Sequence, residues 1–99
     1  AVFTPGEIAY CESMRYPEQH YAARFAAKEA FGKAIGSGLR HFALRDIAVL
    51  NDSHGKPFMM LTGAAEAAFK DFGGARLVCS LSHERDNALA VVIIEGGES

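Results

Sequence analysis

The sequence has little net charge, no long apolar run and no leader-like start, and each absence excludes a class of protein. The formal net charge of the 99 residues is −2 at pH 7, which does not suggest a nucleic-acid coat or a polybasic membrane anchor. No apolar stretch approaches the roughly 18 residues that span a bilayer. The opening AVFTPGE has no basic region followed by an apolar one, so it does not look like a signal peptide.

Cysteine is also scarce, and its spacing is uninformative. Cys11 and Cys79 lie far apart in the sequence, without the short spacing of a zinc site or the density of a disulfide framework. Apolar neighbours surround both residues, so we expect reduced thiols in the core. Together with the missing leader, this predicts a cytoplasmic protein.

What the sequence does contain is enough for one small domain over residues 1–99. A chain of this length buries a modest core and often gains stability by self-association. Thr4-Pro5-Gly6-Glu7 has the pattern of a capping box with proline at the first helical position. It predicts a helix that ends near Ser13.

Two further helices are expected. A long one spans residues 17–35, because alanines are frequent there and proline occurs only at its start; Gly36-Ser37-Gly38 should end it. A third spans residues 63–72 with Thr62 as its cap. Helical spacing predicts that four phenylalanines are core residues: Phe25, Phe31, Phe69 and Phe72.

Four strands are expected to pair as two antiparallel hairpins. Residues 46–50 and 58–61 flank the turn NDSHGKP, and residues 76–83 and 87–95 flank ERD. The run Val91–Ile94 predicts a central strand buried on both faces. Helices and hairpins in this order indicate the α+β class, with a long helix and short helices packed on a small antiparallel sheet.

The long helix carries a group of charges that has two interpretations. Residues four apart share a helix face, so Glu29 and Lys33 form one row and Arg24 and Lys28 form the next, predicting a contiguous cluster. The cluster is either a solvated face with a Glu29–Lys33 ion pair or a polyphosphate site. In the second case the cations would bind phosphate oxygens and the carboxylate would hold a divalent metal.

Three stretches resemble one enzyme family. RFAAKEAFGKAIGSG, NDSHGKP and CSLSHERDNALAVVIIE, in this order and spacing, are similar to holo-[acyl-carrier-protein] synthase, the small 4′-phosphopantetheinyl transferase. The likeness covers essentially the whole chain. It implies the family's α+β fold and the transfer of 4′-phosphopantetheine from coenzyme A to a serine of apo-acyl carrier protein. The products would be the holo-carrier and adenosine 3′,5′-bisphosphate, with Mg²⁺ on the coenzyme A diphosphate.

The resemblance also implies roles for individual residues. Glu29 would be a metal ligand and the leading base for the serine proton, directly or through a water, and Lys28 would assist catalysis at the phosphates. The coenzyme A contacts implied are Arg24, Lys28, Lys33, Gly36, Ser37, Gly38, Lys56, Pro57, Ser82 and His83. Three other histidines, His20, His41 and His54, are expected at the surface.

One feature of the family pattern is missing. Family members begin with a strand whose aspartate is the second metal carboxylate, followed by a basic helix that docks the carrier protein. The aspartates at 46, 52, 71 and 86 all fall in later elements, so we expect that the N-terminal part of the family domain is absent.

Three classes of function therefore remain open. The chain is a working transferase, a catalytically impaired module that binds coenzyme A or the carrier protein, or an interaction domain whose charged helix is merely solvated. Family members are commonly homotrimers, and the apolar C-terminal third is consistent with burial in such an interface.

Overall fold

A computed structural model describes residues 2–36 and 42–97. Within these ranges the helices and strands follow the expected order. The helices are α1 (Pro5–Glu12), α2 (Pro17–Ile35) and α3 (Gly63–Asp71), with a short 3₁₀ turn at Leu44–Asp46. The strands are β1 (Ile47–Asn51), β2 (Pro57–Leu61), β3 (Gly74–His83) and β4 (Ala88–Gly96). The predicted α+β class is confirmed, and none of the described helices is long and apolar enough to cross a membrane.

The helix ends follow the local chemistry of the sequence. The Thr4 hydroxyl accepts a hydrogen bond from the Glu7 amide, and the Glu7 carboxylate accepts one from the Thr4 amide, which completes the capping box of α1. Helix α2 ends at Gly36, whose φ of 94° is left-handed and favours glycine. Thr62 occupies the cap position of α3 as predicted, but its side chain makes no capping hydrogen bond there.

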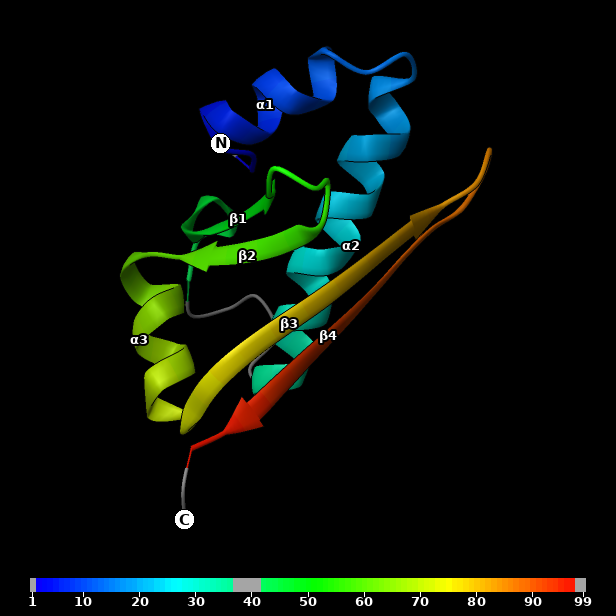
Figure 1. Ribbon diagram of the computed structural model, residues 1–99. Coiled ribbons are helices and arrows are strands. Elements are labelled where there is room, and N and C mark those ends of the chain that lie inside the picture. Colours follow the sequence, from blue (N-terminus) through cyan, green and yellow to red (C-terminus); the bar gives the residue numbers. More distant parts are fainter. Residues whose placement is uncertain (1, 37–41, 98–99) are drawn as a thin grey trace.

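The described strands form two separate two-stranded antiparallel sheets rather than one. In the first, Val49 of β1 lies opposite Met59 of β2. In the second, β3 and β4 pair from Gly74 with Gly96 to His83 with Ala88. Figure 1 shows this second ribbon crossing the long helix α2, while α1 and the β1–β2 hairpin lie beside the first half of α2.

The core lies where α2, the two ribbons and α3 meet. Its buried members are Phe31, Phe42, Ile47 and Ala65, and half-buried side chains of β2, β3 and β4 pack around them. The rings of Phe31 and Phe42 meet edge to face, with centroids 5.6 Å apart. Cys11 and Cys79 are buried free thiols, as predicted.

Two predictions of burial are wrong. Strand β4 alternates between half-buried and exposed residues, because α2 covers only one face of the β3–β4 ribbon. Its outer face exposes Leu89, Val91 and Ile93. Phe25 and Phe72 are also exposed, at 39% and 53%, because α2 turns Phe25 away from the core and Phe72 follows the last turn of α3.

Candidate functional site

Helix α2 divides the charged residues of the predicted cluster between a buried face and an exposed face. Arg24 and Lys28 are 2% and 0% exposed, whereas Glu29 and Lys33 are exposed. The predicted contiguous cluster of three cations and one carboxylate is therefore wrong. The reason is geometric: successive helical residues are about 100° apart, so a helix that buries position 28 turns position 29 outward. Among the described residues the ion pairs are Glu7–Lys28 and Arg76–Glu95, so Glu29 and Lys33 do not form the expected pair.

Lys28 is held inside the protein by three hydrogen bonds. Its Nζ donates to the Val2 carbonyl at 2.7 Å, to Glu7 Oε1 at 2.8 Å and to the Leu44 carbonyl at 3.0 Å. These contacts use all three donors of the ammonium group. Burial lowers the pKa of Lys28, against the opposing effect of Glu7. The catalytic and phosphate-binding roles of Lys28 stay predictions, and in this arrangement its ammonium points inward.

Arg24 is fixed one helical turn before Lys28. Its Nε donates to the Val49 carbonyl at 3.1 Å, and its Nη2 donates to Asn51 Oδ1. The guanidinium also lies over the Tyr10 ring, 4.4 Å from the ring centroid, in a cation–π contact. Arg24 therefore joins α1, α2 and β1 at one point.

A hollow of about 140 Å³ opens next to this arginine. It brings together three residues that the resemblance predicted as coenzyme A contacts: Arg24, Pro57 and His83. They come from α2, the start of β2 and the end of β3, so this part of the site exists only after folding. The hollow has further lining residues that sequence reasoning missed, namely Tyr10, His20, Ala23, Asn51, Gly55 and Leu81.

His20 lies closer to this site than the sequence predicted. Its ring packs edge-on against the ring of His83, with centroids 4.8 Å apart, and it is half-buried rather than exposed. Burial, helped by His83 and Arg24, lowers the pKa of His20, so its neutral form is favoured. His54 is exposed as predicted, and His41 lies outside the described residues.

The turn between β1 and β2 forms one wall of the hollow and is rigidly built. The side-chain amide of Asn51 donates to the Gly55 carbonyl at 3.0 Å, while its oxygen accepts from Arg24. Asp52 Oδ1 accepts from the amides of His54 and Lys56 at 2.8 and 2.9 Å. The NDSHGKP motif is thus a turn closed by its own side chains, and Asn51 connects it to Arg24.

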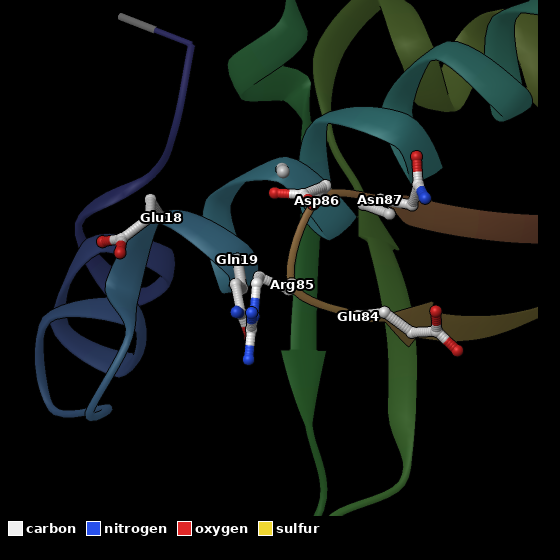
Figure 2. A pocket seen from close by; sticks show the side chains of 8 residues that line it. Glu18, Gln19, Glu84, Arg85, Asp86 and Asn87 are labelled. Atoms are coloured by element: carbon white, nitrogen blue, oxygen red, sulfur yellow. The ribbon is translucent and has the colours of Figure 1, made fainter.

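The remaining predicted residues that the structure describes do not line this hollow. Lys56 and Ser82 are exposed next to Pro57 and His83, and Gly36 ends α2. Ser37 and Gly38 fall outside the described residues. A second hollow, of about 120 Å³, is lined by the first turns of α2 and by the β3–β4 turn (Figure 2). It mixes charges of both signs and contains none of the predicted site residues.

The donor set suits a metal shared with a phosphate ligand rather than a protein-enclosed metal. No group of three or more histidine, cysteine or acidic side chains forms a metal site in residues 2–36 and 42–97. Glu29 offers one exposed carboxylate, with Lys33 one turn further along the same face. Mg²⁺ commonly takes one or two carboxylates and completes its shell with water and substrate phosphates. The exposed residues present therefore fit such an ion.

Comparison with known proteins now identifies the fold. Residues 1–92 match the family model of the 4′-phosphopantetheinyl transferase superfamily. Holo-[acyl-carrier-protein] synthase of Treponema denticola is 60% identical over 95 residues, which cover 95% of this chain and 77% of that protein. The crystal structure of the Neisseria meningitidis holo-[acyl-carrier-protein] synthase has a TM-score of 0.85 at 37% identity, covering 95% of this chain and 76% of that one.

A further solved relative bears on the ligand. The Helicobacter pylori holo-[acyl-carrier-protein] synthase, crystallised in complex with coenzyme A, has a TM-score of 0.81 at 27% identity over 95% of this chain and 77% of that one. The chain belongs to the 4′-phosphopantetheinyl transferase superfamily, within the holo-[acyl-carrier-protein] synthase group. Its fold is that of a phosphopantetheinyl transferase, as the resemblance predicted.

Proposed function

We propose that this chain moves 4′-phosphopantetheine from coenzyme A to a serine of an apo-acyl carrier protein, with Mg²⁺, and releases adenosine 3′,5′-bisphosphate. The observation that carries this proposal is the exposed pair Glu29 and Lys33, one carboxylate and one ammonium a helical turn apart, in a chain of this family. The ammonium of Lys28, next to Glu29 in the sequence, is used inside the fold.

The hollow beside Arg24 is our candidate for the nucleotide end of coenzyme A. The coenzyme A complex of the H. pylori relative supports such a ligand. The hollow offers two imidazole rings and a tyrosine ring against which a planar base can pack. The guanidinium of Arg24 adds positive charge to the wall. Lys56 and Ser82, exposed beside it, would reach the phosphate and ribose groups.

Glu29 and Lys33 would act at the diphosphate. The carboxylate of Glu29 would hold Mg²⁺, which when bound withdraws charge from the diphosphate oxygens. The ammonium of Lys33 would donate charge-assisted hydrogen bonds to the same phosphates as negative charge grows on the leaving group. Glu29 is also the leading acceptor for the serine proton. Gly36, Ser37 and Gly38 follow α2 in the sequence, and backbone amides of this stretch would bind the phosphates.

The functional residues fall into two groups, and this supports a site shared between subunits. Arg24 and His83 line the hollow, whereas Glu29 and Lys33 stand on the exposed face of α2. The outer face of β4 exposes three large apolar side chains, Leu89, Val91 and Ile93, at 63%, 49% and 52%. A stripe of this kind typically marks a protein interface, so we propose a homotrimer. The two free, buried thiols agree with a reducing cytoplasm.

Mass spectrometry of an apo-acyl carrier protein tests the transfer. Incubation with this chain, coenzyme A and Mg²⁺ should add the mass of one phosphopantetheine group to the carrier and release adenosine 3′,5′-bisphosphate. Chelation of the metal should stop both. An unmodified carrier under all conditions would contradict the proposal.

A second candidate is a module that binds coenzyme A or the carrier without chemistry. The observation in its favour is that no group of three or more histidine, cysteine or acidic side chains forms a metal site in the described part of the chain. Calorimetry separates the candidates: binding of coenzyme A without transfer would favour the module. No binding with or without Mg²⁺ would leave only an interaction domain.

A further inference from the structure

The buried pair Glu7–Lys28 lies at the point where α1, α2 and β1 meet. Both side chains are fully buried, and Lys28 Nζ lies 2.8 Å from Glu7 Oε1. The same Oε1 accepts the Thr4 amide at 2.9 Å, and Oε2 accepts the Val49 amide at 3.0 Å. Glu7 thus caps α1 and also bonds to α2 and β1, although the sequence pattern indicates only the capping role.

Val49 shows why this junction is rigid. Among the described strands β1 pairs with β2 alone, and charged side chains of α1 and α2 form hydrogen bonds with its backbone. The Val49 amide donates to Glu7, and the Val49 carbonyl accepts from Arg24 Nε at 3.1 Å. Two consecutive turns of α2 are therefore linked to Val49 of β1. Arg24 bonds to Val49 directly, and Lys28 is linked to it through Glu7.

These hydrogen bonds fix the rotation of α2 about its axis, and this rotation determines which way Glu29 faces. Adjacent helical residues are about 100° apart around the axis, so fixing Lys28 inward fixes Glu29 on the exposed face. Ala27 and Phe31, on either side of Lys28 on α2, are also buried, but apolar packing is non-directional, so the hydrogen bonds of Lys28 add a directional constraint on the rotation of the helix. We infer that Glu7 and Lys28 are positioning residues, which hold α2 in the rotation that presents the Glu29 carboxylate to a metal–diphosphate ligand.

The inference rests on the proposed function and can be tested by metal binding. The double variant Glu7→Gln/Lys28→Met removes both buried charges at similar volume. Mn²⁺, used as a spectroscopic substitute for Mg²⁺, is titrated by electron paramagnetic resonance in the presence of coenzyme A, well below the melting temperature of each variant. We expect the double variant to stay folded by circular dichroism and to bind Mn²⁺ about tenfold more weakly, as when supporting residues of other metal sites are changed.

Glu66→Gln/Lys70→Met is the matched control, because it removes one exposed carboxylate and one exposed ammonium from α3. It should bind Mn²⁺ like the unmodified chain. If the double variant does not fold, Glu7→Asp alone, which keeps both charges but draws the carboxylate back from Lys28 and Val49, is measured in the same way and should also bind more weakly.

The outcomes are distinct. A lower melting temperature with unchanged Mn²⁺ affinity would make the pair merely structural and overturn the inference. An equal loss in the control would show that removing a carboxylate and an ammonium anywhere in the protein weakens binding, and would overturn the inference too. If the unmodified chain binds no Mn²⁺ with coenzyme A, the proposed function itself fails, and the inference with it.

Discussion

Replacing Lys28 with methionine should destabilise the fold far more than any exposed charge change. The variant keeps most of the side-chain volume but leaves the Glu7 carboxylate buried without its partner. Removing one member of a buried ion pair costs about 3–5 kcal/mol. For a domain of this size, that corresponds to a fall in melting temperature of about 12–40 °C. Since the free energy of unfolding of small domains is about 5–15 kcal/mol, this loss is a large part of it.

The assay is urea unfolding followed by far-ultraviolet circular dichroism. Lys33→Met is the control, because it makes the same change on the exposed face of the same helix. Its effect should stay within about 1 kcal/mol, as for other exposed charges. The double variant Glu7→Gln/Lys28→Met should recover much of the loss, because no buried charge is then left unpaired. If Lys28→Met is as stable as Lys33→Met, the assignment of Lys28 to the interior is refuted.

Three further predictions concern other parts of the protein. Lys33→Ala should raise the KM for coenzyme A about tenfold or more, through the loss of a charge-assisted hydrogen bond; steady-state kinetics with an unchanged KM would remove Lys33 from the phosphate contacts. Because the folded chain lowers the pKa of His20, the unfolded chain binds its proton more readily, so stability should rise as the pH increases towards about 6.5. Thermal melts from about pH 5.5 to about pH 7.5 should show this rise in the unmodified chain and a smaller one in His20→Gln; equal slopes would argue against it. Finally, Ile93→Glu should dissociate the proposed trimer and leave the subunit folded, as measured by analytical ultracentrifugation, and an unmodified chain that sediments as a monomer would contradict the interface.

The elements of the fold were predictable because strong local signals mark their ends. Pro17 and Gly36 bound α2 at the positions expected, since proline suits the first helical turn and glycine suits the left-handed residue after the last. The turn NDSHGKP likewise identifies the β1–β2 hairpin. Each signal lies within a few residues of the feature that it specifies.

Which face of each helix or strand is buried could not be predicted from these local signals. Helix α2 has apolar residues on most of its circumference, so the sequence could not tell that Lys28 is buried and Phe25 exposed. The partner that makes burial of Lys28 tolerable is Glu7, which is distant in sequence. For β4, the run of four β-branched residues looks the same whether one face or both are covered.

The candidate site was predictable only in part. The resemblance gave Arg24, Pro57 and His83, which the fold brings to one hollow. Tyr10 and His20 carry no motif that would have identified them, since their contribution depends on the approach of α1, α2 and β1. Asn51 offers a weak signal, because it begins the turn that contains Pro57.

The most direct test of this account compares Glu29→Ala with Glu66→Ala in the carrier-modification assay. Both variants remove one exposed glutamate from a helix, and both should unfold at the temperature of the unmodified chain. We expect that Glu66→Ala still adds phosphopantetheine to the apo-carrier and that Glu29→Ala adds none. Modification by Glu29→Ala at the rate of the unmodified chain would contradict it.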